Sequence, residues 1–504
     1  MEILFITTTN LSTNPRILKE LRLALERGYE CTFIGFKLGN WSDKTEQEHL
    51  NLFNGLKVNY LSSGTLAGTS ATLSVRHGWL SVVRYRWLSV VEARYLTTLV
   101  WKLSIIFNKI FKKNIKIAAY AHNKRSFQIE RILKKQKDKY DLIIAHNLGA
   151  LYPTFKFAKK HHIPFAFDIE DYHPGEKCSP AERYRREILM QELLPKAAYI
   201  SYASPLIGEH TLKLLTSAKP ESSRLDGIKY MATGTKCISR SVCGTDMLKV
   251  EVIAEDIKLP QSILINNSFS QDEFQLIEIA DKKVQFVWFS QNITWGRGLE
   301  LIVPALLKYK EKVHLSLIGN KRIDFYNQFL AHFDEFITYI EPLPQDKLHL
   351  RLSEYDIGLA IEVSNVDLNK DIALSNKIFA NAQSGLFILA TDTLAQKQFI
   401  EEQNEDFGSA LSPDFGSFRL RSTTTAQSPD FGTALSKGFD SAQTRIEIGM
   451  LSAQSIEAME KAVSRIIDEV EIIRANKRVR FEYANRLAWE HESQRLLNIW
   501  EQLP

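Results

Sequence analysis

Two separate runs of alternating strand and helix patterns constrain the fold of this chain most strongly. In the first run, an apolar segment at 3–8 is followed by a helix pattern at 16–27 and a second apolar segment at 30–36. Further strand patterns follow at 142–145 and 165–168. Strand, helix and strand in this order form the repeating unit of a parallel sheet. The first run therefore predicts a doubly wound α/β domain.

The second run begins after residue 260 and predicts another domain of the same kind. A chain of 504 residues with 44% hydrophobic residues can bury two cores, because a single core stops growing near roughly 250–300 residues. Doubly wound sheets bind ligands beyond the carboxyl ends of their strands. We therefore expect an α/β fold with two Rossmann-like domains facing each other across a cleft. The strands expected in the second domain are 263–265, 284–290, 313–319, 337–340, 357–361 and 386–391.

The predicted domain boundaries follow the interruptions of this pattern. The N-terminal domain is expected at 1–205 and the C-terminal domain at 261–484, and a last helix at 485–504 is expected to cross back to the N-terminal domain. Residues 216–260 are polar and irregular, which indicates an insertion. A second insertion is expected at 405–443, where the phrase DFGSALS recurs as DFGTALS in a low-complexity segment.

Motifs that the sequence lacks exclude several classes of protein. It has no Walker A loop, no GxGxxG, no HExxH and no GxSxG, which argues against most nucleotide hydrolases, dehydrogenases, zincins and α/β-hydrolases. The formal net charge of +5 is too weak for a nucleic-acid-binding surface, so we expect no nucleic-acid partner. The four cysteines form no CxxC pair. We therefore expect neither a cysteine-bound zinc site nor thioredoxin-like chemistry.

The start of the chain and its longest apolar runs bear on location. The segment MEILFITTT has no basic region ahead of its apolar residues, so it is interpreted as a first strand and not as a signal peptide. No run reaches the roughly 18 apolar residues that a membrane-spanning helix needs. We expect a cytoplasmic protein.

A basic segment at 76–125 interrupts the first domain. It holds eleven Lys or Arg residues against the single acid Glu92, interleaved with aromatic residues. A basic helix with aromatic anchors suits the surface of an anionic membrane. The alternative is a solvated helical face over a core. The sequence leaves both interpretations open, and the first predicts peripheral membrane association.

The segment Trp295–Glu300 has the features of a phosphate-binding turn between a strand and a helix. Gly296 and Gly298 allow a ligand to approach the backbone closely, and the following helix N-terminus offers free N–H groups. Arg297 adds a delocalised cation suited to a diphosphate. The alternative is an ordinary glycine turn with a surface arginine.

A second cation stands at the start of a later helix. Ser375 and Asn376 can cap this helix, and Lys377 lies in its first turn, where the helix dipole disfavours a positive charge. A cation in this position is better accommodated if an anion binds nearby. The alternative is a lysine on a solvated face.

A histidine and an acidic cluster follow two strands of the first domain. His146 stands at the carboxyl end of one strand, and Glu170 and Asp171 follow the next. A histidine can orient or deprotonate a hydroxyl, and carboxylates can hold sugar hydroxyls. We therefore place these residues at the mouth of the expected cleft.

Taken in order, these segments resemble a known family. In this order and spacing they are similar to the retaining, family-4-like glycosyltransferases (group 1) of the GT-B fold, and the similarity covers both halves outside the three irregular segments. The segments are ILFITTTNLSTNPRILKEL, YDLIIAHNLGALYP, FDIEDYH, ILINNSF, WGRGLELI, LSLIGN, YDIGLAI and SNKIFANAQSGLFILATD.

The resemblance implies a metal-independent transferase without a cofactor. Its C-terminal domain would bind a nucleoside-diphosphate sugar, and the sugar would pass with retained anomeric configuration to a sugar, lipid-linked or polysaccharide-precursor acceptor. Arg297, Lys377 and His146 match the family's catalytic positions. The expected donor contacts are Gly296, Gly298, Gly319, Ser375, Asn376 and Asp371, and the expected acceptor contacts are Asn10, Asn14, Arg16, Glu170 and Asp171.

One departure from the family pattern leaves other functions open. The two glutamates that the family places in the last motif, one of them on the donor ribose, are replaced here by Ile372 and Ala380. Ribose contacts would then come from Asp371, Asn381 or Glu362. The alternatives are a non-catalytic sugar- or nucleotide-binding homologue in a membrane-associated assembly, and a GT-B nucleotide-sugar epimerase.

Overall fold

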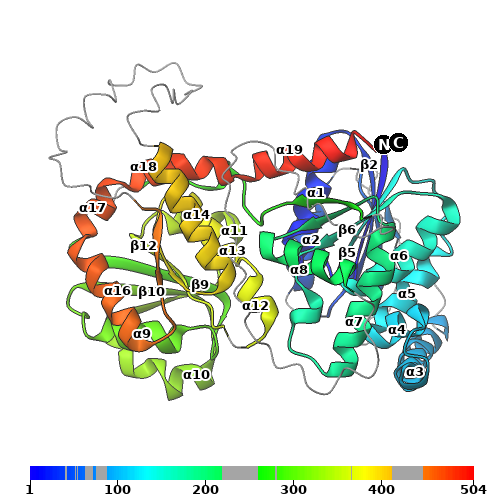
Figure 1. Ribbon diagram of the computed structural model, residues 1–504, viewed down its shortest axis with the longest axis horizontal. Helices are drawn as coiled ribbons and strands as arrows, with labels where there is room; N and C mark the ends of the chain where they lie inside the picture. Colours follow the sequence, from blue (N-terminus) through cyan, green and yellow to red (C-terminus); the bar gives the residue numbers. More distant parts are fainter. Residues whose placement is uncertain are drawn as a thin grey trace. The chain divides into compact units, whose positions relative to one another are not determined.

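The computed structural model forms two compact units, each built on its own sheet (Figure 1). It describes residues 1–39, 42–51, 53, 55–62, 72–74, 88–217, 259–277, 281–364, 366–410 and 447–503. Residues 76–87 of the basic segment, nearly all of the predicted insertion 216–260 and most of 405–443 lie outside these residues. The first unit contains Met1–Asn267, Val366–Ala373 and Glu492–Pro504, and the second contains Ser268–Asn365 and Leu374–His491.

The first unit holds an eight-stranded sheet in the order β4-β3-β2-β1-β5-β6-β7-β8. The short strand β4 pairs antiparallel with β3, and the pairs from β3 to β8 are parallel. The strands are β1 (Glu2–Thr7), β2 (Glu30–Lys37), β3 (Lys57–Ser62), β4 (Thr72–Ser74), β5 (Leu142–His146), β6 (Phe165–Ile169), β7 (Tyr199–Tyr202) and β8 (Gln261–Leu264).

Helices lie on both sides of this sheet in Figure 1. Buried strands β1, β5 and β6 read as continuous apolar runs because both of their faces are covered. The helices are α1 (Pro15–Glu26), α2 (Ser42–Asn51), α3 (Leu88–Ile110), α4 (Ile115–His122), α5 (Lys124–Leu133), α6 (Leu148–His161), α7 (Pro180–Leu193), α8 (Pro205–Thr216) and α12 (Leu368–Ile372).

The end of the first unit differs from the expected boundary. Residues 263–265 were expected to open the second domain, but β8 pairs in parallel with β7 and completes the first sheet. Ile265 is fully buried, and its N–H donates to the carbonyl of Tyr202. A strand pattern does not reveal which sheet the strand joins, and here a long polar segment separates β8 from its neighbour in sequence. The first unit therefore continues to Asn267.

The second unit holds a six-stranded sheet in the order β11-β10-β9-β12-β13-β14, with parallel pairs throughout the described strands. Its strands are β9 (Val284–Ile293), β10 (Val313–Lys321), β11 (Ile337–Ile340), β12 (Ile357–Ala360), β13 (Phe387–Thr391) and β14 (Gly449–Ser452). Its helices are α9 (Leu299–Leu307), α10 (Ile323–Gln328), α11 (Gln345–Leu352), α13 (Asn376–Gln383), α14 (Leu394–Ala410), α16 (Ile456–Asp468), α17 (Val470–Ala475) and α18 (Lys477–Ala484).

The last helix, α19, spans Trp489–Trp500, and its residues from Glu492 onward belong to the first unit. Glu492 accepts hydrogen bonds from the backbone N–H and the side-chain amide of Asn266. The buried indole of Trp500 donates to the hydroxyl of Tyr199 at 2.8 Å. These contacts attach the C-terminal segment to β7 and to the residues that follow β8. No helix in the described part of the chain is long and apolar enough to cross a membrane.

Candidate functional site

A polar cavity of about 110 Å³ lies at the carboxyl ends of β5 and β6 in the first unit. This is the edge of a doubly wound sheet at which ligands bind. Its lining is almost entirely polar, which suits a ligand with several hydroxyl or charged groups. The lining residues are Thr13, Asn14, Asn147, Asp168, Glu170, Asp171 and His173.

Asn147 enters this cavity from a strained backbone position between β5 and α6. Its φ angle is 66° and its ψ angle 137°, a conformation that costs a non-glycine residue roughly 1–3 kcal/mol. Its Oδ1 accepts hydrogen bonds from the hydroxyls of Thr7, at 2.7 Å, and Thr8, at 3.2 Å. The side-chain NH₂ group is therefore the donor that Asn147 can offer to a ligand.

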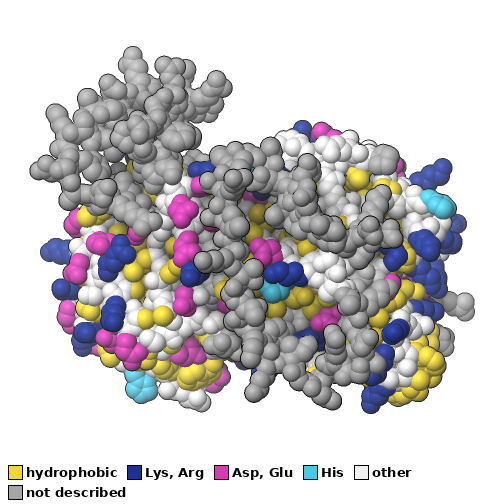
Figure 2. Space-filling view, viewed as in Figure 1, with side chains coloured by type: hydrophobic (Ala, Val, Ile, Leu, Met, Phe, Trp, Pro, Cys, Tyr) yellow, Lys and Arg dark blue, Asp and Glu magenta, His cyan; other side chains and the backbone are white. Residues whose placement is uncertain are grey.

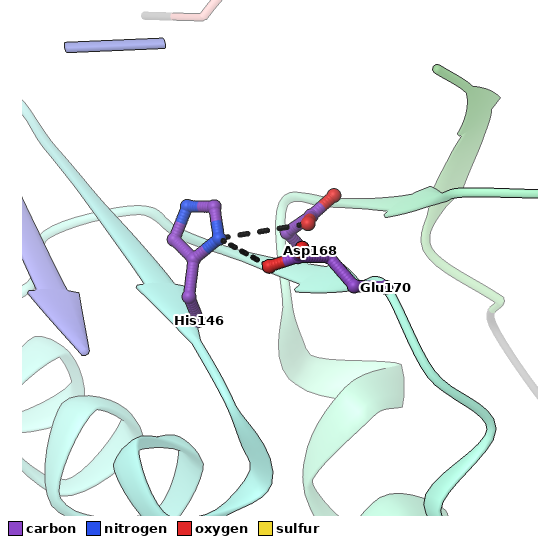
Figure 3. A group of neighbouring side chains, drawn as sticks. All are labelled: His146, Asp168 and Glu170. Carbon is purple, nitrogen blue, oxygen red and sulfur yellow. Dashed lines mark ion pairs between the residues drawn. The ribbon is translucent and has the colours of Figure 1, made fainter. Parts of the chain in front are cut away.

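His146 is fully buried and is not among the residues that line the cavity. Figure 3 shows its ring facing Asp168 and Glu170. Its Nε2 lies 3.0 Å from Oε2 of Glu20 on α1. Its Nδ1 faces Asp168 Oδ2 at 3.5 Å and Glu170 Oε1 at 3.6 Å. The register of the sheet explains this meeting, because His146 pairs with Asp168 across β5 and β6. Full burial means that His146 acts through Asp168 and Glu170 and does not itself line the cavity.

The ionisable groups around His146 shift one another's pKa values. Burial alone would lower the pKa of His146, but the carboxylates of Glu20, Asp168 and Glu170 raise it well above its ordinary value. Burial raises the pKa of Glu20. Burial opposes ionisation of Asp168 too, yet Arg16, His146 and Ser201 hold its pKa below the ordinary range. Asp168 is therefore ionised at neutral pH.

Two of the predicted acceptor contacts have structural partners instead. Asn10 is fully buried, donates to the hydroxyl of Ser42 at 2.8 Å, and accepts from the backbone N–H of Thr13 at the start of a 3-10 helix, η1 (Leu11–Thr13). Arg16 is fully buried and donates to the carbonyl of Ile265 and to Asn267 Oδ1. Neither is among the residues that line this cavity.

The other predicted residues of the first unit do meet at the cavity. Asn14, Glu170 and Asp171 line it, although Asn14 also caps α1 by accepting from the backbone N–H of Ile17 at 3.1 Å. Asp171 Oδ1 accepts from the side chain of Asn369 on α12 at 2.7 Å. These partners fix both side chains at the rim.

Sequence reasoning missed Glu20 and did not select Asp168 or Asn147. Glu20 stands four residues after Arg16, so both lie on one face of α1, and that face also carries the buried residues Ile17 and Leu21. The sequence signal that could have indicated a buried role for Glu20 was the presence of two opposite charges on the apolar face of this helix. The partner of Glu20 was not readable, because His146 is 126 positions away in sequence.

In the second unit, the glycine turn before α9 has the geometry that was predicted from its residues. Gly298 is the N-cap of α9 with φ of 81°, and a Cβ atom there would lie 2.2 Å from the side chain of Ile361. Gly296 has φ of 70°, and its N–H donates to Glu300 Oε1 at 2.5 Å. Arg297 is half-buried and has no hydrogen-bond or ion-pair partner among the described residues.

Gly319 sits where β10 approaches β9 closely. Its φ is 152°, and a Cβ atom would lie 2.2 Å from the carbonyl oxygen of Ser290. Both residues stand at the carboxyl-terminal part of their strands, on the same edge of the sheet as Gly298. The glycine is therefore required by the sheet itself, whether or not a ligand binds beside it.

Lys377 already has an anionic partner within the protein. Its ammonium lies 2.6 Å from Glu362 Oε1 and 5.6 Å from the ring centre of Trp288. Ser375 caps α13 by accepting from the backbone N–H of Lys377 at 3.3 Å, and Asn376 is the first residue of that helix. The anion that was expected from a bound ligand is thus supplied in part by Glu362.

Asp371 lies in a different unit from the other predicted donor contacts. It stands on α12, and residues Val366–Ala373 belong to the first unit. Asn369 of the same helix accepts from the backbone N–H of Tyr172 at 2.7 Å. The proximity of Asp371 to Lys377 in sequence therefore does not place it in the second unit.

Comparisons with known proteins agree with this architecture. No family model and no curated protein matches the sequence. Sucrose-phosphate synthase from Thermosynechococcus elongatus has a similar structure, with a TM-score of 0.56, 11% identity and coverage of 100% of this chain and 99% of that one. Anabaena HepE in complex with UDP aligns over 100% of both chains with a TM-score of 0.54 and 11% identity. The lipopolysaccharide outer core galactosyltransferase WaaB aligns over 99% of both chains, with a TM-score of 0.50 and 11% identity.

These similarities define the class of fold. The chain has the GT-B fold, with two Rossmann-like units, which the sequence analysis predicted. Identities near 11% establish the fold alone.

Proposed function

We propose that the protein is a glycosyltransferase that moves a sugar from a nucleoside-diphosphate sugar, bound by the second unit, to an acceptor bound in the cavity of the first. The observation that carries the proposal is Arg297 in the glycine turn before α9, which has no hydrogen-bond or ion-pair partner in the described part of the chain. The structural similarity to HepE, whose structure was solved with UDP-glucose, supports the same class of donor.

The turn before α9 suits the diphosphate of such a donor. A helix N-terminus presents free N–H groups, and the two glycines let phosphate oxygens reach the backbone. Arg297 can form paired hydrogen bonds to these oxygens and stabilise the charge that develops on the leaving diphosphate. We propose that Lys377, together with Glu362, holds another part of the donor. Neither residue needs a metal ion for this role.

The cavity of the first unit suits a hydroxyl-bearing acceptor. Asp168 and Glu170 accept hydrogen bonds, and the Asn147 amide donates one. The anion of Asp168 can also orient an acceptor hydroxyl by accepting a charge-assisted hydrogen bond from it. His146 contributes by setting the charge of this wall from behind it. We propose that the anomeric configuration is retained, as the family resemblance implies.

A second candidate function is a nucleotide-sugar-binding protein without catalysis. Ile372 and Ala380, which replace the family's two glutamates, are both fully buried, and neither side chain carries a polar group. Neither position can therefore supply a polar contact to a donor. Arg297, which has no partner among the residues that the structure describes, favours the transferase.

A nucleotide-release assay separates these functions. The purified chain would be incubated with UDP-, GDP- and ADP-sugars, with and without sugar and lipid-linked acceptors. Sustained release that depends on an acceptor supports the transferase, and proton NMR of the product reports its anomeric configuration. Donor binding without turnover supports the binding protein. Release without an acceptor, with an epimerised sugar, supports an epimerase.

We further propose that α3 places the protein on an anionic membrane surface. Its exposed residues include several large apolar side chains, such as Ile106 at 56% exposure and Ile110 at 72%, together with Lys102 and Lys109. Its buried face carries the polar residues Thr97, Ser104 and Asn108. Figure 2 shows hydrophobic and basic side chains side by side at the lower right, where Figure 1 draws α3.

The exposed side of α3 carries large apolar side chains and the buried side carries polar ones, so contact with an apolar phase on the exposed side would stabilise the helix. Residues 95–116 contain no acidic side chain and five lysines, at 102, 109, 112, 113 and 116. A helix that combines exposed apolar residues with lysines binds the interface of anionic lipid. The cytoplasmic leaflet carries such lipids, so we propose this leaflet as the site of binding.

A further inference from the structure

The segment between β1 and α1 forms part of the cavity at the carboxyl ends of β5 and β6, because Thr13 and Asn14 line it. Residues 8–14 contain no glycine, and Leu11–Thr13 form η1. A segment that has left the sheet must find other hydrogen-bond partners for its backbone groups. The partners of η1 therefore decide how Thr13 and Asn14 face an acceptor.

One buried carboxylate, that of Glu46 on α2, holds the start of η1. Its Oε1 accepts from the backbone N–H of Leu11 at 3.0 Å, and its Oε2 accepts from the backbone N–H of Ser12 at 2.7 Å. The hydroxyl of Ser12 also donates to Oε2, at 3.0 Å, and the hydroxyl of Tyr60 on β3 donates to Oε1. Glu46 is only 4% exposed, so these four donors replace the water that the carboxylate loses on burial.

The neighbours of Glu46 support the same arrangement. Tyr60 stays a donor, because burial and the negative charge of Glu46 raise the pKa of its phenol. Ser42 and Glu46 stand four residues apart on α2 and so share one face of this helix. Ser42 Oγ accepts from the side-chain amide of Asn10, the N-cap of η1, at 2.8 Å. One face of α2 therefore holds both the cap and the first turn of η1.

The backbone N–H groups of residues 11–14 all have acceptors within the protein. Those of Leu11 and Ser12 donate to Glu46, that of Thr13 donates to Asn10 Oδ1 at 3.1 Å, and that of Asn14 donates to the carbonyl of Leu11 at 3.1 Å. The first N–H groups of a helix are the ones that bind anions, and here a side chain of the protein has taken them. This segment therefore meets an acceptor through the side chains of Thr13 and Asn14.

We propose that Glu46 is a positioning residue of the acceptor site, which fixes η1 so that Thr13 and Asn14 present their side chains to the acceptor. The inference rests on the proposed transfer of a sugar to an acceptor in this cavity. Glu46 is not among the residues that line the cavity, so it acts through η1. Its loss should weaken acceptor binding and leave donor binding by the second unit unchanged.

Glu46→Gln tests this role, because it keeps the size of the side chain and replaces one acceptor oxygen by an NH₂ group. At least one contact with η1 is then lost. We expect the KM for the acceptor to rise at least about tenfold, since small displacements of binding groups are costly. Both kcat and the KM for the nucleotide sugar should change less than about twofold, because a contact made equally in the ground and transition states affects the acceptor KM alone. Initial rates with the donor and acceptor that give nucleotide release in the assay above measure all three.

Glu130→Gln is the matched control. Glu130 of α5 is also 4% exposed, also accepts from a tyrosine hydroxyl, that of Tyr120, and accepts from Lys156 Nζ at 2.8 Å. It does not line the cavity. Both variants should lower the melting temperature, and only Glu46→Gln should raise the acceptor KM. An equal rise in both would mean that the effect is general destabilisation, and would overturn the proposal.

Hydrogen exchange measures the hold on η1 without any sugar. Mass spectrometry of peptides that contain Leu11 and Ser12 should show exchange at least about tenfold faster in Glu46→Gln, and unchanged exchange in Glu130→Gln. Unchanged exchange in a folded Glu46→Gln chain would show that Glu46 does not hold η1. If this variant does not fold, Tyr60→Phe, which removes one donor to Glu46, replaces it in both measurements.

The kinetic result separates this proposal from the proposed function. Absence of transfer by the unsubstituted chain would overturn both. Transfer by the unsubstituted chain, with an unchanged acceptor KM in the folded Glu46→Gln or Tyr60→Phe chain, would overturn the positioning role alone.

Discussion

Glu362 Oε1 lies 2.6 Å from the ammonium of Lys377, and both side chains are largely buried, at 15% and 9% exposure. Lys377 is therefore already paired with an anion of the protein when no ligand is bound. A diphosphate that reaches Lys377 would join an existing ion pair, and the carboxylate would moderate its attraction. This relationship makes the role of the pair testable through stability.

Removing the carboxylate should make the second unit depend on nucleotide. We expect Glu362→Gln to lose about 3 kcal/mol of unfolding free energy, because a largely buried ammonium is left without its partner. UDP or ADP should restore more stability to this variant than to the unsubstituted chain. Thermal melting with and without nucleotide measures both effects.

The matched control is Glu447→Gln, which removes another partly buried carboxylate of the second unit, paired with Arg465 at 3.0 Å. Its response to nucleotide should equal that of the unsubstituted chain. An equal response in Glu362→Gln would place the diphosphate away from Lys377.

Arg297→Ala tests the proposed phosphate turn directly. The side chain is half-buried and makes no polar contact in the described part of the chain, so its removal should change stability by less than about 0.5 kcal/mol. Transfer should fall on the order of 10²–10³-fold if the guanidinium stabilises the leaving diphosphate. Steady-state turnover and thermal melting measure the two effects separately.

Arg478→Ala is the control for this variant, because Arg478 is an exposed arginine of α18 in the same unit. Arg297→Lys should recover only part of the activity, since an ammonium cannot form the paired hydrogen bonds of a guanidinium. Near-normal turnover of Arg297→Ala would remove this residue from the donor site.

The sequence predicted the alternation of each sheet well, because buried parallel strands and their helices have strong patterns. It also predicted the glycine turn, since Gly296 and Gly298 owe their conformation to their own residue type. It did not assign β8 to its sheet. An apolar pattern predicts that a segment is a strand. Which strand it pairs with depends on contacts between residues far apart in sequence, and the pattern does not contain these.

The candidate site was only partly predictable for the same reason. His146 and Glu170 follow strands, which marks the functional edge of a sheet. The contact between His146 and Glu20 joins β5 to α1 and depends on how the helix packs on the sheet. The pairing of Lys377 with Glu362 likewise required coordinates, although both residues were considered from the sequence.

His122 gives a pH dependence with a definite sign. Burial lowers its pKa to about 3, assisted by His173, Arg185 and Arg186, while Glu176 opposes the shift. Between pH 6.5 and about 3 the unfolded chain binds a proton here and the folded chain does not. Stability should therefore fall as the pH falls through this range, by roughly 1.4 kcal/mol per pH unit from this residue.

His122→Gln removes this titration and keeps a polar side chain. The difference in unfolding free energy between the two proteins, measured by urea at several pH values, should change in favour of the variant as the pH falls below 6.5. Above pH 7 the difference should be constant. A constant difference down to pH 4 would mean that His122 has the same pKa in the folded and the unfolded chain, and would contradict this prediction.

Sedimentation with lipid vesicles tests the proposed role of α3. Ile106, Phe107 and Ile110 are exposed on this helix, and each would bury apolar area in the lipid interface. We expect the chain to bind vesicles that contain phosphatidylserine at low salt, and to bind weakly to neutral vesicles.

The triple change of these residues to Ser should weaken binding at least about tenfold, while Lys109→Gln together with Lys113→Gln should mainly reduce the salt dependence. Ile323→Ser is the control, because this exposed isoleucine belongs to the second unit. Equal sedimentation of the triple variant and the unsubstituted chain, or no sedimentation of either at low salt, would show that the apolar face of α3 does not bind lipid.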